Sequence, residues 1–364
     1  MSGQRSLYRA EQLPVFQNRM FSSDAEARNC VRGDVELVQD GGTGLIFNRA
    51  FDRALMIYDS NYQNEQGHSP VFRLHLENVA EVVQRHFAGC ELIEVGCGKG
   101  LFLEQLQSMG FAITGLDPTY EGTNPAVIRD YFTPAVGLRG DALVLRHVLE
   151  HIPDPVTFLA QLRDANGGQG KIYIEVPCLD WIAAHRTWFD VFYEHVNYFR
   201  LGDFARMFGT VHEVGHTFGG QYLYAVADLS SVRTPVASPV DTFEFPAEFL
   251  DGVTRSAERL KSATATAAQL GFTRAPAVIW GGASKGVIFA LFMERAGASL
   301  DLVIDINPAK QGCHLAATGL RVYAPDDALA RLSPGTDLFV MNRNYLDEIQ
   351  VQTNFQFNYI TPAP

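Results

Sequence analysis

Cysteines are few in this 364-residue sequence, and they are scattered. None belongs to a C-x-x-C pair, so they provide neither a disulfide framework nor the ligands of a structural zinc site. The histidines outside the motifs described below also lack metal-ligand spacing. We therefore expect no bound metal. The five cysteines are Cys30, Cys90, Cys97, Cys178 and Cys313.

Basic residues are outnumbered, because 29 Lys and Arg stand against 41 Asp and Glu and the net charge is -12. This acidic balance argues against nucleic acid or an anionic membrane as the main partner. Long apolar runs are also missing. No stretch approaches the roughly 20 residues that cross a membrane, and the N-terminus lacks the apolar core of a signal peptide. We expect a cytoplasmic protein, monomeric or homodimeric, that acts on a small molecule.

The sequence does contain alternating strand-like and helix-like segments, which predict an α/β fold with doubly wound parallel sheets. Residues 1–75 are irregular, and we expect a loop-rich region there that serves as a lid or an arm. Residues 76–229 are predicted to form a first α/β domain. Prolines mark a linker over 230–246, and the alternation resumes in a second α/β domain over 247–364.

A glycine-rich turn follows the first strand of the first α/β domain. It reads E-V-G-C-G-K-G from Glu94 to Gly100, and Asp117 ends the next strand. Glycines let a ligand approach the main chain, and a carboxylate at that strand end can accept hydrogen bonds from a ribose diol. NAD enzymes and S-adenosylmethionine enzymes share this arrangement. The G-x-G-x-G spacing departs from the dinucleotide pattern, and the carboxylate of Glu94 would repel a pyrophosphate but suits a cationic, methionine-derived group. We therefore predict S-adenosylmethionine.

The motifs E-V-G-C-G-K-G, G-L-D and VLRHVLEHIPDP resemble those of class I S-adenosylmethionine-dependent methyltransferases. The resemblance implies that fold, with S-adenosylhomocysteine as product. It also implies that the turn lines the methionine and ribose, that the next strand ends flank ribose and adenine, and that the fourth strand borders cofactor and acceptor. The residues concerned are Glu94, Gly96, Cys97, Gly98, Gly100, Asp117, Pro118, Asp130, Tyr131, Arg146 and His147.

An aromatic segment, WFDVFYEHVNYF, follows the fifth strand and contains Glu194 and His195. Such a segment could form the wall of a cavity in which the histidine takes a proton at neutral pH. It could equally be a packing segment with a buried, hydrogen-bonded histidine.

This segment and the later motifs GGASKG and IDINPAKQG are similar to those of sugar C-methyltransferases acting on nucleotide-linked keto-deoxysugars. That family joins a zinc-binding module, a methyltransferase domain and a C-terminal Rossmann-like domain. The resemblance implies that His195 is the base paired with Glu194, and that Tyr62 reaches the site. Tyr62, Tyr193 or His147 would hydrogen-bond an enolate oxygen.

Two departures from that family concern the acceptor. The zinc module's cysteines are absent, and the tyrosine expected two residues before Glu194 is Phe192, with Tyr193 beside it. An O-methyltransferase acting on a sugar or another hydroxylated small molecule is therefore an alternative. A non-catalytic scaffold that binds the cofactor is another, and a dehydrogenase using the C-terminal turn is a third.

That C-terminal turn runs from Gly281 to Gly286, and Asp305 ends the next strand. Its backbone N–H groups, with Ser284, Lys285 and Lys310, could hold a phosphate of the acceptor. The turn could also be an empty element of the fold that walls the cleft.

Overall fold

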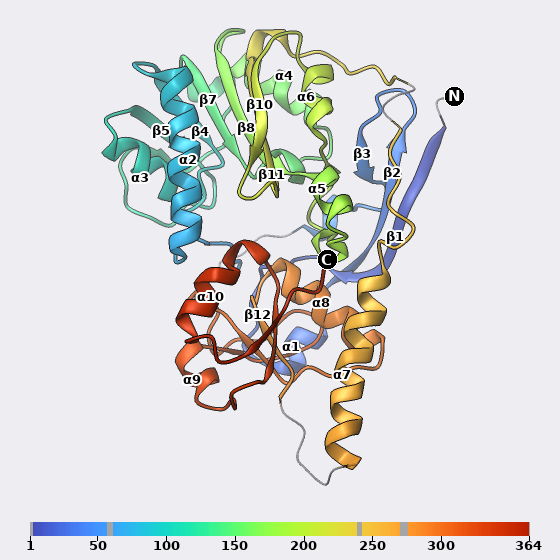
Figure 1. Cartoon of the computed structure of the whole chain (residues 1–364). Coiled ribbons are helices and arrows are strands. Elements are labelled where there is room, and N and C mark those ends of the chain that lie inside the picture. Colours follow the sequence, from blue (N-terminus) through green and yellow to red (C-terminus); the bar gives the residue numbers. More distant parts are fainter. Residues whose placement is uncertain (1–2, 57–60, 239–241, 270–275, 364) are drawn as a thin grey trace.

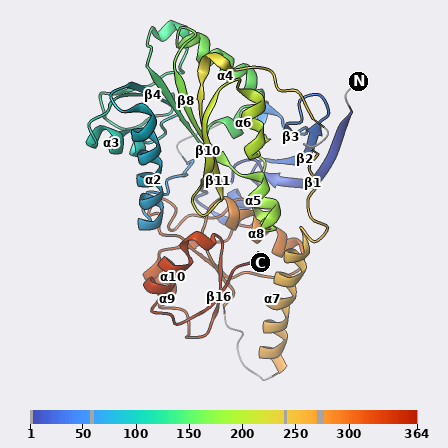
Figure 2. The same cartoon turned by 45° about the horizontal axis from the view of Figure 1, so that its top comes forward.

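The computed structural model describes residues 3–56, 61–238, 242–269 and 276–363 (Figure 1). The predicted linker falls partly outside these residues. Within them the strands form three sheets. Figures 1 and 2 show the largest sheet and its helices stacked against a second α/β unit, with the strands of the N-terminal region along one side.

The largest sheet has seven strands in the order β10-β11-β8-β7-β4-β5-β6. All its pairings are parallel except those of β11, which runs antiparallel to both of its neighbours. This is a doubly wound α/β arrangement, so the predicted fold class is confirmed. The strands are β4 (Glu91–Val95), β5 (Ala112–Leu116), β6 (Val127–Ile128), β7 (Ala142–Arg146), β8 (Lys171–Pro177), β10 (Val211–Thr217) and β11 (Tyr222–Asp228).

Helices around this sheet begin and end at residues suited to those positions. In α2 (Pro70–Phe87) the hydroxyl of Ser69 accepts from the N–H of Phe72, and a proline occupies the first turn, where its missing N–H costs nothing. Helix α3 (Leu101–Ser108) starts directly after the glycine turn. The others are α4 (Pro155–Ala165), α5 (Leu179–Ala184) and α6 (Leu201–Met207).

A second sheet of five parallel strands lies in the C-terminal part, in the order β14-β13-β12-β15-β16. Its strands are β12 (Val278–Trp280), β13 (Leu302–Ile304), β14 (Val322–Tyr323), β15 (Asp337–Val340) and β16 (Asn358–Ile360). Its helices are α7 (Asp251–Gln269), α8 (Ser284–Arg295), α9 (Pro325–Leu329) and α10 (Leu346–Gln352). One mostly parallel and one fully parallel sheet confirm the expected α/β character of both parts.

The N-terminal region contains, besides loops and the short helix α1 (Asp24–Arg28), an antiparallel sheet that the sequence analysis missed. Its order is β1-β2-β3-β9. The register of β1 against β2 shifts twice, which breaks the apolar alternation typical of a strand. The strands are β1 (Gln4–Pro14), β2 (Arg32–Asp40), β3 (Ile46–Asn48) and β9 (Asn197–Tyr198). Because β9 follows the Glu194-His195 segment, this sheet ties the N-terminal region to the first α/β unit.

No helix among the described residues combines the length and the apolar character needed to cross a membrane.

Candidate active site

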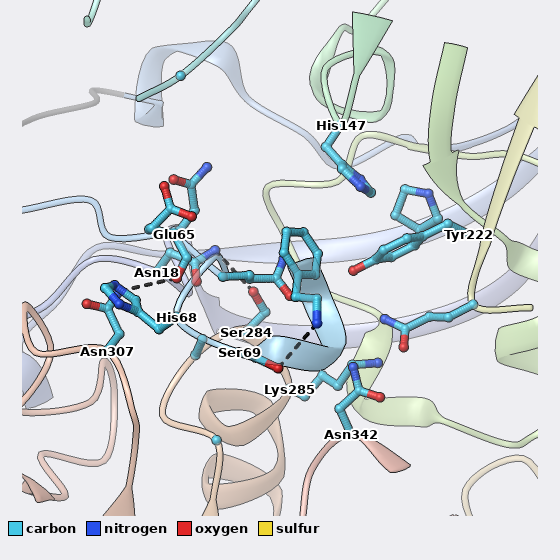
Figure 3. Close-up of a pocket in the computed structure, with 18 of the residues that line it drawn as sticks. Asn18, Glu65, His68, Ser69, His147, Tyr222, Ser284, Lys285, Asn307 and Asn342 are labelled. Carbon is cyan, nitrogen blue, oxygen red and sulfur yellow. Dashed lines mark hydrogen bonds between the residues drawn. The ribbon is translucent and has the colours of Figure 1, made fainter. Parts of the chain in front are cut away.

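A cavity of about 360 Å³ lies where the two parallel sheets face each other, and N-terminal segments also line it. Residues after β4, β7 and β8 contribute one wall, and residues after β12, β13 and β15 contribute another. Carboxyl ends of parallel strands are where open α/β sheets bind ligands. Figure 3 shows His147 and Tyr222 across the cavity from Lys285 and Asn342, with Asn18 and other N-terminal residues beside them.

The first glycine turn lines this cavity through Gly96, Cys97 and Gly98. Gly96 and Gly98 have φ of 72° and 55°, in the left-handed region that favours glycine. A Cβ at Gly96 would lie 2.5 Å from Cγ2 of Val148. Asp117 is buried behind the turn, and its Oδ2 accepts from the N–H of Gly98 at 2.9 Å. The turn therefore places backbone without side chains next to the carboxylate of Asp117.

Glu94 is buried in the same wall, and its Oε2 has no hydrogen-bond partner among the described residues. Burial raises its pKa to about 7, against the opposing effect of Arg146. A buried carboxylate oxygen without a partner is costly. A cationic ligand would supply the missing partner, so this wall fits the sulfonium and ammonium groups of S-adenosylmethionine.

Three described residues that the sequence predicts to bind the cofactor are not part of the cavity lining. Pro118 and Asp130 are exposed, and Tyr131 is 69% exposed. Oδ1 of Asp130 accepts from the N–H of Tyr131. Gly100 lies just beyond the cavity lining, where a Cβ would be 3.5 Å from the ring of Tyr120. The adenine contact predicted for Asp130 or Tyr131 stays a prediction.

A buried polar network centred on Glu175 supports the cavity wall. Its Oε1 lies 3.0 Å from Nη2 of Arg146, 2.9 Å from Nε2 of His147 and 3.3 Å from Nε2 of His75. Burial alone would raise the pKa of Glu175, but the charge of Arg146 and the hydrogen bonds with His147 and His75 hold it well below its usual range. Glu175 and His75 were not among the residues predicted from the sequence. Their contacts span segments 29 and 100 residues apart, which no local pattern reveals.

His147 lines the cavity. Its backbone φ is 52°, in the left-handed region that residues other than glycine rarely adopt. Its Nδ1 lies 3.3 Å from Oε1 of Glu150, and its Nε2 faces Glu175. Burial opposes protonation, but the two carboxylates raise the pKa of His147 to about 9. At neutral pH this imidazole is therefore a fixed cation on the cavity wall.

His195 also lines the cavity, and its environment is the opposite. Burial, together with the electrostatic effect of nearby basic side chains that include His147 and Lys285, holds its pKa well below the usual range. The ring centroids of His195 and Phe192 are 4.1 Å apart, and those of His195 and His151 are 4.9 Å apart. His195 is therefore a neutral imidazole, the form that can accept a proton.

The carboxylate of Glu194 is held by Tyr62 and Gln17. Its Oε2 accepts from the hydroxyl of Tyr62 at 2.8 Å, and its Oε1 accepts from the N–H of Gln17 at 3.1 Å. Burial raises its pKa. The carbonyl of Glu194 lies 2.8 Å from Nδ1 of His151. The structure thus brings Tyr62, Glu194, His195 and His151 together. His151 lies in the HIPDP motif but was not singled out from the sequence.

Tyr193 lies outside this group. Its hydroxyl accepts from the N–H of Asp52 at 2.7 Å, and its ring contacts Gly33, where a Cβ would be 2.2 Å from it. The ring therefore packs into the N-terminal sheet, whereas Phe192 lines the cavity. The role predicted for Tyr193 as a hydrogen-bond donor to the substrate does not fit this position.

The predicted phosphate-binding residues line the second wall, and each has a protein partner. Nζ of Lys285 pairs with both carboxylate oxygens of Asp190. Ser284 Oγ accepts from the amide of Asn18 at 3.1 Å. Nζ of Lys310 lies 3.5 Å from Oδ2 of Asp305.

Three side chains of the cavity lining are close enough together to ligate a cation. Glu150, His151 and His195 offer ligand atoms within 4.8 Å of one another. The sequence predicts no metal here.

Residues 66–211 match the family described as "Methyltransferase domain". This is the kind of domain that the sequence predicts, and S-adenosylmethionine is the cofactor that the buried wall around Glu94 fits. The match spans less than half of the chain.

The curated relatives carry two kinds of name. Human mitochondrial "Ubiquinone biosynthesis O-methyltransferase" is 28% identical over 106 residues, covering 23% of this chain and 29% of that protein. "C-methyltransferase NovU" of Streptomyces niveus is 27% identical over 130 residues, covering 32% and 31%. The chain therefore spans about a third of the length of the curated relatives it matches. These names describe oxygen methylation by the first relative and carbon methylation by the second.

Similar solved structures include the plantazolicin methyltransferase BpumL in complex with a pentazolic desmethylPZN analogue and SAH. It has a TM-score of 0.37 and 17% identity, and the match covers 48% of this chain and 89% of that one. A SAM-dependent methyltransferase from Aquifex aeolicus has a TM-score of 0.35 and 16% identity, covering 45% and 95%.

Proposed function

We propose that this protein is an S-adenosylmethionine-dependent methyltransferase that methylates a small acceptor at the carbon beside a ketone. A nucleotide-linked keto-deoxysugar is the acceptor class that we favour. The observation that carries the proposal is the position of His195, a neutral imidazole on the wall of the same cavity as the glycine turn. S-adenosylmethionine would supply the methyl group.

The first task of the chain is to hold that donor. The open backbone at Gly96 and Gly98 allows close approach. The buried Oε2 of Glu94, which has no hydrogen-bond partner among the described residues, would pair with a cationic group of the donor. Asp117, fixed by Gly98, is placed to accept from ribose hydroxyls. Orientation of donor and acceptor in one cavity contributes much of the rate in such reactions.

The second task is to make the acceptor carbon nucleophilic. His195 takes the proton from the carbon beside the ketone, and an enolate results. The negative charge that develops on the ketone oxygen needs a fixed cation or donor nearby. His147, held protonated by Glu150 and Glu175, is the cavity residue best suited to this. Tyr62, oriented by Glu194, is a second donor in the same lining.

A second candidate is methylation of an acceptor oxygen. Phe192 presents a phenyl ring against His195, where the resemblance to sugar C-methyltransferases calls for a hydroxyl. Several relatives are also named as O-methyltransferases. In that reaction His195 would take the proton of a hydroxyl group instead.

The deciding experiment is incubation with S-adenosylmethionine and a nucleotide-linked 4-keto-deoxysugar in deuterated water, followed by mass spectrometry. Enzyme-dependent deuterium uptake beside the ketone, with S-adenosylhomocysteine formation, supports carbon methylation. His195→Gln should lose both while still binding the cofactor. His212→Gln, on exposed β10 beside Asp228, is the matched control and should keep both. Methyl transfer without exchange supports the oxygen acceptor.

A further inference from the structure

Glu150 and His151 lie beside His195 because two distant segments of the chain are bonded to each other. The 3₁₀ turn after β7 contains Glu150 and His151, and His195 lies just before β9. The N–H of Val196 donates to the carbonyl of Glu150 at 2.8 Å. Nδ1 of His151 donates to the carbonyl of Glu194, also at 2.8 Å. The two segments therefore hold these side chains together on one part of the cavity wall.

The hydrogen bond of His151 to the backbone determines which of its nitrogens is left for a ligand. A carbonyl oxygen can only accept, so Nδ1 carries a proton and Nε2 is the nitrogen that remains. Histidines that bind metals are usually held in this way, with the other ring N–H donating to a backbone carbonyl or a carboxylate. His151 is thus oriented as a metal ligand would be.

Glu150 contributes a buried carboxylate that has one oxygen left over. Its side chain is 1% exposed, and Oε1 lies 3.3 Å from Nδ1 of His147. Oε2 has no hydrogen-bond partner in the part of the chain that the structure describes. An unpaired carboxylate oxygen is costly when it is buried. A cation bound at Oε2 would remove this cost.

Glu150, His151 and His195 offer ligand atoms within 4.8 Å of one another, and all three side chains line the cavity. Two imidazoles and one carboxylate bind zinc in enzymes that leave the fourth position open. Mg²⁺ and Ca²⁺ prefer oxygen ligands. Ligand atoms lie about 2.0–2.2 Å from Zn²⁺, so each side chain would move toward the ion by less than about 1 Å.

We propose that Glu150, His151 and His195 form a binding site for Zn²⁺, and that the bound ion prevents His195 from accepting a proton. An imidazole binds a metal through the same lone pair that accepts a proton. Zinc at this site therefore inhibits the reaction proposed above. The inhibition rests on the proposed function, because it assumes that His195 is the base. The zinc site itself rests only on the geometry of the three side chains.

The test is titration of the full, metal-free chain with Co²⁺, whose visible absorption reports nitrogen and oxygen ligation, followed by displacement with Zn²⁺. We expect Zn²⁺ to displace Co²⁺ and Mg²⁺ to leave it bound. Glu150→Gln and His151→Gln should each weaken Co²⁺ binding by at least about tenfold, because losing a ligand costs no less than losing an outer-shell partner. His212→Gln, which changes a histidine that is about a third exposed on β10, is the matched control and should bind as the unaltered chain does.

Zn²⁺ should also stop deuterium uptake beside the ketone in the unaltered chain, and a chelator should restore it. Co²⁺ binding that is unchanged in both ligand variants overturns the zinc site. The proposed function would survive that result, because it is judged without metal. Zinc that occupies the site without slowing deuterium uptake would overturn both the inhibition and the role of His195 as base.

Anomalous diffraction from zinc-soaked crystals of the unaltered chain provides a second measurement, which decides even if the ligand variants fail to fold. We expect the zinc signal between Glu150, His151 and His195. Zinc bound only elsewhere, or no bound zinc, overturns the site. Because neither diffraction nor Co²⁺ absorption depends on turnover, a chain that shows no methyl transfer would still decide the metal site.

Discussion

The hydroxyl of Tyr62 donates a 2.8 Å hydrogen bond to Oε2 of Glu194, 132 residues later in the chain. This bond joins the N-terminal region to the segment that carries His195. Glu194 is 1% exposed, and its remaining oxygen accepts from the backbone of Gln17. The N-terminal region is therefore part of the cavity wall and is held there by a buried carboxylate.

Tyr62→Phe should destabilise the protein by about 1–3 kcal/mol, because it leaves an oxygen of buried Glu194 without its donor. Urea denaturation measures the effect. Methyl transfer should fall as well, since the wall around His195 loosens. Tyr131→Phe, which changes a side chain that is 69% exposed, is the matched control and should change the free energy of unfolding by less than about 0.5 kcal/mol. Equal effects of the two variants would contradict the role given to Tyr62.

The raised pKa of His147 predicts that the free energy of unfolding depends on pH. Its pKa in the folded protein is raised to about 9, because Glu150 and Glu175 outweigh burial. A group whose folded pKa lies above its unfolded value contributes stability that is fully present below about pH 6.5 and is lost as pH rises through the folded value. We expect the free energy of unfolding to fall between pH 6.5 and 9 by up to about 3 kcal/mol.

His147→Gln should flatten that part of the pH profile, because glutamine does not titrate. Unfolding by urea at pH 6, 7, 8 and 9 provides the comparison. His212→Gln is the control, since His212 of β10 is about a third exposed and pairs with Asp228 of β11. An unchanged slope in His147→Gln would assign the pH dependence to another group.

The cofactor turn could be predicted from sequence because its signal is local. Gly96, Gly98 and Asp117 lie at fixed spacings around one strand–turn–helix unit, and the chemistry of each follows from its residue type. The second turn was found in the same way through Gly281 and Asp305. What the sequence could not show is which backbone N–H group of each turn holds its aspartate, that of Gly98 or that of Gly282, because those bonds depend on backbone geometry.

Other parts of the site depend on contacts between distant segments. Which of Phe192 and Tyr193 faces the cavity is decided by the N-terminal sheet, where Gly33 makes room for the tyrosine ring. That sheet escaped prediction because β1 shifts register against β2. Likewise, Glu175 is a carboxylate within the mostly apolar strand β8, and nothing near it in the sequence points to a partner. Its partners Arg146 and His75 come from other elements, which only the folded structure brings close.

Glu94 predicts that cofactor affinity depends on pH. Burial raises its pKa to about 7, so the carboxylate that pairs with a cationic ligand forms only as pH rises through that value. S-adenosylmethionine should therefore bind more tightly at pH 8 than at pH 6. Glu94→Gln should bind it about tenfold more weakly at pH 8, as expected for the loss of a charged hydrogen-bond partner, and should show little change with pH. Calorimetric titration at the two pH values is the measurement, and a pH-independent affinity in the unaltered protein would contradict the role of Glu94.

Lys285 and Asp190 form a buried ion pair between α8 and the 3₁₀ turn Trp188–Asp190, which joins the two α/β units at the cavity. Removing one partner leaves the other charge buried and unpaired, which typically costs about 3–5 kcal/mol. Lys285→Met alone and Asp190→Leu alone should each destabilise the protein by that amount. The double variant should cost less than the sum of the two, because neither charge remains. A double-mutant cycle by urea denaturation measures the coupling, and additive single effects would show that the two charges do not stabilise one another.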